Sequence, residues 1–487
     1  MQLVAYGAQD IYLTANPQIT FFKQLYRRHS NFAMESIEQT FNGVANFGKR
    51  VTCTIARNGD LITRVYLQVT LPSVSSQDVS AGSCSQFSWI PFVGQYLISS
   101  VELEIGGQRI DKHYGHWLHV WNELTLPTGK ARDYLSMVNG FGGVALDAGG
   151  DTCNSCSVET TASNKCVQGL AVAKLASFGV DATVCEANNI ATAIPSELDN
   201  PLVNSLLTEN HVSDCLPETT LYIPLEFWFN RHTGLALPLI ALQYHEVKIN
   251  LEINDVRNLV NAVGNSSTPA TATSQVQAFV NTINTKGLVA ASLYVDYIYL
   301  DTEERRRFAQ VAHEYLIEQL QYTGEESVTS SSNKIQMSFN HPCKELIFTV
   351  QNPSYIDCTS QTNQPWNYAD VQGGNPIVTA KIQLNGHDRF TERLGDYFNK
   401  VQPYQHHTAS PSTGINVYSF ALKPEELQPS GTCNFSRIDN AVLQLTLTPS
   451  AVGSGNGGNS SANVRIYATN YNVLRIMSGM GGLAYSN

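Results

Sequence analysis

The feature that most constrains this chain is an internal duplication, because a repeated sequence is expected to fold twice into the same kind of unit. Ile37–Gln39 recurs as Ile317–Gln319, at an offset of 280 (317 − 37). Gly115, followed two residues later by an aromatic residue, recurs as Gly395 at the same offset. Other correspondences keep almost this offset: Val65, Leu67, Val69 and Pro72 match Leu346, Phe348, Val350 and Pro353, and Val101–Ile110 resembles Ala380–Phe390. We therefore expect two copies of one β-rich unit.

The two copies differ in length. Tyr222, which precedes an apolar run, resembles Tyr418 at an offset of only 196 (418 − 222). The offset thus falls by 84 (280 − 196) between Gly115 and Tyr222, so a segment of that length in the first copy lacks a counterpart in the second. Residues 137–214 are rich in Gly, Ser, Thr, Ala and Asn and form the expected insertion. A stretch of this length inside a compact domain is usually a functional surface excursion or a disordered segment.

The stretch Asp301–Gly324 joins the two copies. Its first half predicts a short helix with Asp301 as N-cap, Glu304 as the capping-box partner and three arginines near the C-terminal end, where cations suit the helix dipole. Its second half predicts a strand that enters the second unit.

Strand signals dominate both units. In the first unit, alternating runs at 34–41, 49–55 and 63–71 are separated by Asn-Gly turns, and this spacing is typical of a sandwich or barrel. Each unit offers about eight strands, the number in a jelly roll. The predicted fold class is therefore all-β, with two tandem eight-stranded antiparallel jelly rolls, short helices and long loops.

The expected domains are set by the repeat. Residues 1–30 form an N-terminal arm with a short helix near Phe21–Arg28, residues 31–305 form the first jelly roll with its insertion, and residues 306–487 form the second. Two further polar loops are expected at 258–286 and 453–463.

Charge and targeting signals exclude several classes of protein. The net charge of −11 is spread along the chain, which argues against direct nucleic-acid binding, since that depends on clustered Lys and Arg. The first ten residues lack the basic and apolar regions of a signal peptide, and the longest apolar run is too short to span a membrane. We expect synthesis in the cytosol, where the ten cysteines are by default free thiols.

The clearest candidates for a metal or disulfide site lie in the insertion: Cys153, Cys156, Cys166 and Cys185. Their spacing is irregular, so a zinc knuckle or two disulfides are weak alternatives to free thiols. Three sequons offer candidate glycosylation sites at Asn265, Asn434 and Asn459, although a composition rich in Asn, Ser and Thr also produces such matches by chance.

No convincing catalytic site or cofactor site emerges from the motifs. Gly43–Arg50 matches GxxxxGK, but Arg50 stands where a phosphate-binding loop needs Ser or Thr. An enzyme on a cupin-like barrel is the remaining catalytic alternative. Its ligands would be His113, His116 and Glu123, or His406 and His407.

Three runs of the sequence resemble the major capsid protein of nucleocytoplasmic large DNA viruses, in its chlorovirus-like and marseillevirus-like form. They are VAYGAQDIYLTANPQITFFKQLYRRHSNFAMESIEQT (Val4–Thr40), RNGDLI (Arg57–Ile62) and YLDTEERRRFAQVAHEYLIEQLQ (Tyr299–Gln321). The resemblance is specific at the N-terminus and at the joint, and weaker over the strands.

The resemblance implies two tandem jelly rolls and a structural role without enzymatic activity. It implies a homotrimeric capsomer with a pseudo-hexagonal outline, which contacts neighbouring capsomers and tiles an icosahedral shell over an internal membrane. The protein would be assembled in the host cytoplasm and reside in the virion shell. The insertion would face the host.

The resemblance also places the N-terminal arm on the inner face of the shell. There it would meet minor capsid proteins or the membrane. The residues implied in these contacts are Phe21, Phe22, Lys23, Tyr26, Arg27 and Arg28.

The alternative function is that of a glycan-binding, lectin-like virion surface protein, because jelly rolls also occur as lectin domains. Such a protein needs a polar and aromatic pocket at its loop tips. Trp366 and Tyr368 are the candidates for that pocket.

Overall fold

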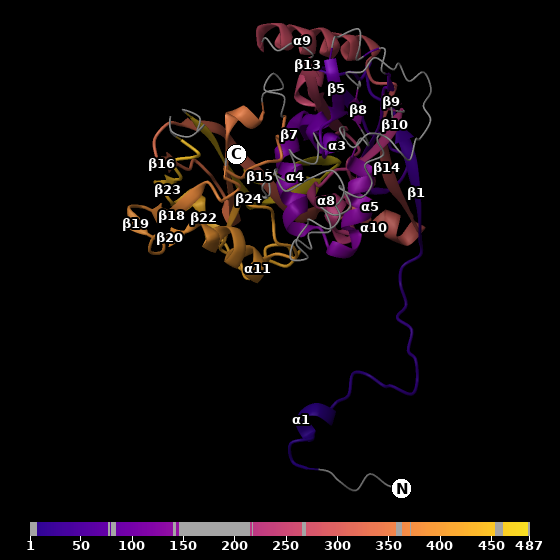
Figure 1. The fold of residues 1–487 in the computed structure, drawn as a ribbon. Coiled ribbons are helices and arrows are strands. Elements are labelled where there is room, and N and C mark those ends of the chain that lie inside the picture. Colours follow the sequence, from indigo (N-terminus) through magenta and orange to yellow (C-terminus); the bar gives the residue numbers. More distant parts are fainter. Residues whose placement is uncertain are drawn as a thin grey trace.

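The computed structural model describes residues 7–75, 78, 84–139, 143–145, 215–216, 218–264, 269–356, 363–370, 372–452 and 461–485. Two antiparallel sheets built from the strands that precede residue 301 form the first barrel (Figure 1). One sheet has the order β1 (Phe32–Gln39), β14 (Ala290–Leu300), β3 (Leu61–Leu71), β10 (Thr219–Pro224). The other has the order β2 (Arg50–Thr54), β12 (Val247–Ile253), β6 (Ile98–Ile105), β7 (Gln108–Tyr114).

The strands after residue 312 form a second barrel with the same plan. One sheet has the order β15 (His313–Val328), β24 (Ala462–Met477), β17 (Pro342–Gln351), β21 (Ile415–Ser419). The other has the order β16 (Ser332–Gln336), β23 (Ala441–Leu447), β18 (Ile377–Leu384), β19 (His387–Asp388). Taken in chain order, each strand of the first barrel occupies the same place as its counterpart in the second. The predicted pair of eight-stranded jelly rolls is confirmed.

The alternation of buried and exposed side chains along the strands explains why each sheet has one buried face. In β3, Val65, Leu67 and Val69 are at most 1% exposed and belong to the core of the first barrel. Tyr66, between them, is partly exposed on the outer face. Because neighbouring side chains of a strand point to opposite faces, a period of two apolar positions places one face in the core.

Pairing corrects the expected register of one strand. Leu221 and Ile223 belong to the core, so Tyr222 faces outward, whereas Tyr418 packs against the core of the second barrel. In the ladders, Tyr222 pairs with Gln68 and Ile415 pairs with Thr349. Since Gln68 and Thr349 are related by an offset of 281 (349 − 68), Tyr222 corresponds to Ile415, at an offset of 193 (415 − 222) and not 196.

Short elements connect the main strands. Helices lie at α3 (Val93–Leu97), α4 (Gly115–Thr125), α5 (Thr128–Val138), α8 (Trp228–Arg231) and α11 (Gln402–His406), with a π-helical turn, η7, at Tyr397–Val401. 3₁₀ turns lie at Thr233–Leu235, Leu239–Ala241, Val256–Asn258, Pro353–Tyr355 and Phe435–Arg437. Minor strands are β4 (Val74–Ser75), β5 (Cys84–Trp89), β8 (Gly143–Ala145), β9 (Cys215–Leu216), β11 (Leu237–Pro238), β13 (Val260–Gly264), β20 (Arg393–Leu394), β22 (Cys433–Asn434) and β25 (Met480–Leu483).

The expected polar loop at 258–286 is wrong for most of its length. The structure places β13 there, followed by the 18-residue helix α9 (Pro269–Lys286). Its buried residues are spaced at i, i+3, i+4 and i+7, which is one face of a helix: Val276, Phe279, Val280 and Ile283. This helical spacing of apolar residues was the signal for α9 in the sequence, but the high content of Ser, Thr and Ala obscured it.

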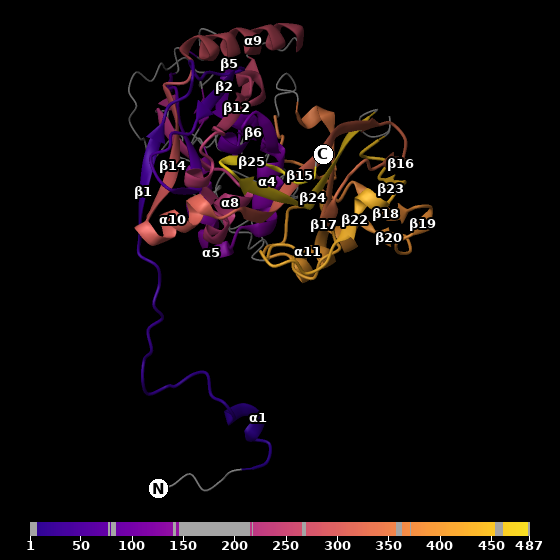
Figure 2. The same ribbon diagram turned by 180° about the vertical axis from the view of Figure 1, so that it is seen from behind.

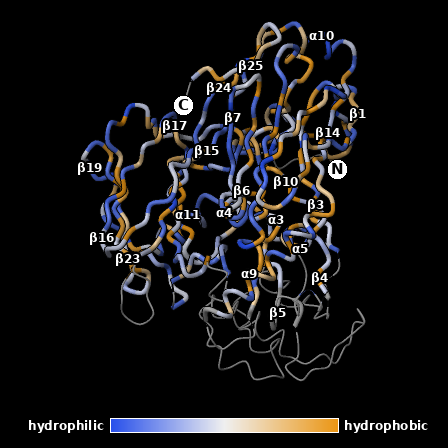
Figure 3. The backbone as a smooth tube through the Cα atoms, turned by 90° about the horizontal axis from the view of Figure 1, so that it is seen from above, coloured by the Kyte–Doolittle hydropathy of each residue, from blue (hydrophilic) through white to orange (hydrophobic). Residues whose placement is uncertain are grey.

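The predicted joint is confirmed as a helix followed by a strand. Helix α10 (Thr302–Gln310) begins after Asp301, whose carboxylate accepts a hydrogen bond from the backbone N–H of Thr302. Strand β15 follows after two residues, so the chain passes directly from one barrel to the other. Hydrophobic and hydrophilic stretches alternate along the backbone of both barrels (Figure 3).

Candidate functional site

Helix α4 forms an apolar contact between the two barrels. Its buried face has the spacing i, i+3, i+4, i+7 and consists of Trp117, Val120, Trp121 and Leu124, none more than 4% exposed. This face packs on the outer side of the β24–β17–β21 sheet. The sheet residues in contact are Ile347, Ile415, Val417 and Tyr467, with Tyr368 beside them. The first barrel therefore covers a face of the second that would otherwise be exposed.

Ion pairs also contribute to the contact between the two barrels. Glu318 of β15 accepts a hydrogen bond from Arg231 Nη1 at 2.9 Å and lies 2.6 Å from Lys344 Nζ. The Arg231 guanidinium lies 4.1 Å from the centroid of the Trp121 ring. Because the Lys344 side chain is fully buried, removing its carboxylate partner would leave an uncompensated charge inside the protein. The ion pairs and the α4 packing together join the two barrels.

The histidines of the cupin-like alternative are not brought together as metal ligands. His113 lies on β7, and its Nε2 is 3.0 Å from the Asp111 carboxylate. His116 and His119 lie on α4, where burial lowers the pKa of both imidazoles. Glu123 accepts a hydrogen bond from the backbone N–H of Ser412. In the part of the chain that the structure describes, no group of three His, Cys, Asp or Glu side chains is placed to hold a metal.

His407 is also engaged in an ion pair. Its imidazole lies 3.1 Å from Glu345 and 2.8 Å from Glu425. Burial by itself lowers the pKa of His407, but the two carboxylates outweigh burial and raise it to about 9. Both ring nitrogens of His407 therefore pair with carboxylates, Nε2 with Glu345 and Nδ1 with Glu425. His406 instead contacts the backbone oxygen of Leu422.

The N-terminal arm extends away from the first barrel (Figures 1 and 2). The expected helix at 21–28 is wrong, because the structure has its short helix at α1 (Ile11–Thr14) and irregular backbone from 21 to 31. All six predicted arm residues are exposed, with Phe21 at 88%, Phe22 at 101% and Tyr26 at 89%. Such an arm of exposed aromatic residues, together with Lys23, Arg27 and Arg28, requires an external partner to become ordered.

The arm lies at the opposite end of the molecule from α9 (Figures 1 and 2). Strand β8 lies inside the predicted insertion and β9 begins directly after it at Cys215, and both strands lie toward the α9 end (Figure 1). The first barrel therefore carries the arm at one end and strands β8 and β9 at the other.

The remaining predicted site residues fall into two groups. Asn434 is exposed on β22, and its side-chain oxygen accepts a hydrogen bond from the backbone N–H of Ser436 at 3.0 Å. Outside the described residues lie Asn265, Asn459, Cys153, Cys156, Cys166 and Cys185. No helix among the described residues is long and apolar enough to cross a membrane.

The pocket expected for a glycan-binding protein is not built by its candidate residues. Tyr368 is only 1% exposed and lies in the contact between the barrels. Trp366 is partly buried and packs against the core of the first barrel. Neither aromatic ring is presented at a loop tip, where a sugar could stack on it.

Sequence reasoning missed an aromatic face on the first barrel. Tyr66 stacks on Tyr294 with ring centroids 5.2 Å apart, and Tyr222 lies 6.4 Å from Tyr66. The three rings come from β3, β14 and β10, and each occupies an outward position between core residues. That alternation was the signal in the sequence, but only strand pairing shows that the three rings form a row.

Family models match nearly the whole chain. The model described as major capsid protein N-terminus matches residues 20–301, and the model described as large eukaryotic DNA virus major capsid protein matches residues 304–482. The boundary between the two matches falls at the α10 joint.

Curated relatives match over nearly their full length. The chain is 48% identical to the major capsid protein of Phaeocystis pouchetii virus, with 100% of this chain and 99% of the relative covered. It is 40% identical to the major capsid protein of Paramecium bursaria Chlorella virus 1, with the same coverage.

Solved structures of viral capsid proteins are also similar to this chain. A chain in the quasi-atomic model of the PBCV-1 virus capsid matches with a TM-score of 0.67 and 35% identity, covering 96% of this chain and 100% of that chain. The Faustovirus major capsid protein matches with the same TM-score at 13% identity, covering 97% and 94%. At that identity, the second match supports the fold alone.

Proposed function

Because this chain belongs to the major capsid protein family of large eukaryotic DNA viruses, a structural component of the virion shell and not an enzyme, we propose that three copies form its capsomer. Each copy contributes two barrels of the same plan, so a trimer presents six similar units around its axis. A three-fold object of this kind can occupy a six-fold position in a lattice. The observation that carries the proposal is the identical strand order of the two barrels.

The buried contact between the barrels supports this assembly. Helix α4 and the buried ion pairs fix how the two barrels of one chain are arranged. A fixed arrangement means that each chain brings its two barrels to the ring already oriented, so less conformational freedom is lost on association. We assign residues 31–305 and 306–487 to the two jelly rolls on this basis.

The polarity of the first barrel supports an orientation in the shell. The arm (residues 1–30) points inward, toward minor capsid proteins and the internal membrane, and the insertion at 137–214 points outward, toward the host. The arm offers exposed aromatic side chains and cations, which suit contacts with minor capsid proteins and with the membrane. The aromatic residues are Phe21, Phe22 and Tyr26, and the cations are Lys23, Arg27 and Arg28. The capsomers contact one another laterally, and assembly takes place in the host cytoplasm.

Light scattering on the purified chain tests the trimer. We expect a stable species of three times the chain mass of 53.5 kDa. A species of one chain mass at concentrations well above micromolar would contradict the proposal.

A further inference from the structure

The chain contains twice the element that joins its barrels. In the first barrel, Gly115 begins α4, and in the second barrel Gly395 precedes η7 and α11 at the same offset of 280. A side-chain carbon on Gly115 would overlap the carbonyl oxygen of Ile98, and one on Gly395 would overlap that of Ile377. Ile98 and Ile377 each begin the corresponding strands β6 and β18. The two glycines therefore occupy the same structural position.

This register assigns counterparts to the contact residues of α4. At the offset of 280, Trp117, Trp121 and Leu124 correspond to Tyr397, Val401 and Tyr404, and Val120 corresponds to Lys400. The α4 residues are buried against the other barrel, at no more than 4% exposure. Their counterparts have no barrel to cover them within the described part of the chain, since Val401 is 40% exposed and Tyr404 is 83% exposed. We call this surface the helix patch and define it as Leu394, Tyr397, Val401 and Tyr404.

The surface that α4 covers also has a counterpart. Ile347 pairs with Tyr467 in the second barrel, and at an offset of 281 (347 − 66) the same position in the first barrel is Tyr66, which pairs with Tyr294. Ile415 corresponds to Tyr222, because their ladder partners Thr349 and Gln68 are related by that same offset. The covered residues Ile347, Ile415 and Tyr467 thus correspond to Tyr66, Tyr222 and Tyr294. We call these three residues the tyrosine face.

The tyrosine face is available on the surface of one copy. Tyr222 is 41% exposed, and Tyr66 and Tyr294 are partly exposed. Glu38 of β1 is paired with Tyr294 in the ladder and is exposed beside it. Three rings and one carboxylate therefore lie where the second barrel carries the apolar surface that α4 covers.

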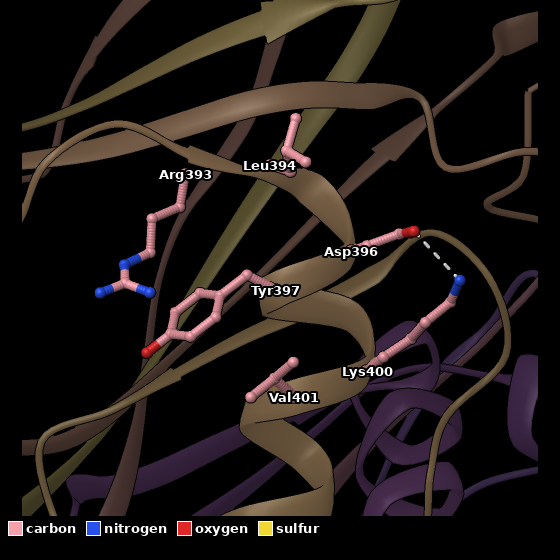
Figure 4. Close-up of a pocket in the computed structure, with 6 residues that line it drawn as sticks. All are labelled: Arg393, Leu394, Asp396, Tyr397, Lys400 and Val401. Carbon is pink, nitrogen blue, oxygen red and sulfur yellow. Dashed lines mark hydrogen bonds and ion pairs between the residues drawn. The ribbon is translucent and has the colours of Figure 1, made fainter.

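The helix patch has a shape and charge that suit such a face. Arg393, Leu394, Tyr397 and Val401 line a hollow of about 340 Å³, together with the ion pair between Asp396 and Lys400 (Figure 4). The Arg393 guanidinium lies 4.4 Å from the centre of the Tyr397 ring. An aromatic ring from another molecule can enter a hollow of this size, and Arg393 can pair with a carboxylate beside that ring.

We propose that the helix patch of one copy packs on the tyrosine face of the next copy and so repeats, between chains, the contact that α4 makes within the chain. This inference rests on the proposed trimer and specifies its interface. The contact is head-to-tail, so each copy offers one patch and one face, and three copies joined in this way leave neither surface free once the ring closes. The counterpart of the contact between Trp117 and Tyr467, whose ring centroids are 5.3 Å apart, is Tyr397 against Tyr294 of the neighbouring copy.

Charge insertion tests the proposal on both surfaces. Val401→Asp and Tyr222→Asp each place a carboxylate in the interface at a site that is about two-fifths exposed in one copy, so both variants should fold. We expect each to lower the mass in light scattering from three chains to one, with unchanged circular dichroism. Val44→Asp is the control, because Val44 is 77% exposed and lies outside both surfaces. It should remain trimeric.

Cross-linking tests the register. The double variant Tyr397→Cys/Tyr294→Cys, after oxidation, should give covalent species of up to three chains on a non-reducing gel, and neither single variant should. If the wild type is trimeric while the two Asp variants remain trimeric and the cysteines do not link, the interface is elsewhere and the trimer proposal stands. If the wild type is monomeric, both proposals are overturned.

Discussion

His407 and Glu345 form an ion pair of 3.1 Å in which neither side chain is exposed. Glu345 lies on β17, and His407 directly follows α11, so the pair fastens the loop after the helix patch to the sheet beneath α4. Burial raises the pKa of Glu345, but His407 and the other groups around it more than offset this effect and lower it. Glu345 and Glu425 together raise the pKa of His407 to about 9.

The pair predicts how stability depends on pH. Because the pKa of His407 in the folded protein exceeds the ordinary value of about 6.5, its contribution is complete below pH 6.5 and is lost as pH rises through 9. The free energy of unfolding should therefore fall by about 3 kcal/mol across this range, as an upper estimate. Because the pKa of Glu345 is lowered, its own contribution is lost as pH falls below about 4.3.

Denaturant unfolding at a series of pH values measures this dependence. His407→Gln should remove the decline between pH 6.5 and 9, although the variant is less stable throughout because Glu345 loses its partner. His387→Gln, at an exposed position on β19, should keep the decline. A wild-type stability that is flat over this range would contradict the role given to the pair.

The packing of α4 predicts a large effect at Leu124. Leu124 is fully buried between the barrels, so Leu124→Ala should lower the free energy of unfolding by about 2–5 kcal/mol through the lost burial and the cavity left behind. Leu13→Ala changes the same residue type at 86% exposure in the arm and should alter stability by no more than about 0.5 kcal/mol. Equal effects in urea unfolding would show that α4 does not hold the barrels together.

Gly395 is predicted to tolerate no side chain. Gly395→Ala places its methyl group against the carbonyl oxygen of Ile377, which should cost roughly 1–3 kcal/mol and weaken the trimer by shifting η7. Gly129→Ala is the matched control, because nothing lies within 4 Å of the added carbon in α5. It should leave stability unchanged or raise it by about 0.4–1 kcal/mol. Melting temperatures of the two variants give the comparison, and a stable Gly395→Ala trimer would refute the expected overlap.

Deletion of residues 1–28 should leave a folded trimer and impair shell assembly, because the arm makes no part of either barrel (Figure 1). The control carries Gln at Lys23, Arg27 and Arg28, and keeps the aromatic residues. Flotation with vesicles that contain anionic lipid separates the inner partners. Binding that is lost in both variants indicates the membrane, and absence of binding by the wild type leaves minor capsid proteins as the partner. Loss of the trimer on deletion would mean that the arm acts between copies.

The insertion is predicted to be dispensable for the core. Replacing residues 146–214 by a short Gly/Ser linker between Ala145 and Cys215 should preserve a soluble trimer, because the main strands of both barrels lie outside the replaced segment. Mass and circular dichroism measure the outcome. Insoluble protein would show that the insertion is structural, for example as a clasp between copies.

The duplication, and the fold class that the duplication implies, can be read from the order of the residues alone. The repeats of Ile37–Gln39 and Gly115 and the alternation in β3 were enough to predict two jelly rolls, because a period of two apolar residues specifies a half-buried strand without any knowledge of its partner. The N-cap at Asp301 was predictable for the same reason, since capping depends on residues adjacent in the chain. The exposed arm was predictable from its composition.

Which faces of the strands and helices meet depends on contacts between residues that are distant in the chain. Tyr222 and Tyr418 look equivalent in the sequence, but one points outward and the other inward, because the register of a strand is set by hydrogen bonds to a partner distant in the chain. The sequence does not show whether His113, His119 and His407 are metal ligands. In the structure, His113 lies beside Asp111, His119 beside Glu123, and His407 beside Glu345 and Glu425. The helix patch and the tyrosine face likewise depend on pairings across the whole chain, which spacing along the sequence does not encode.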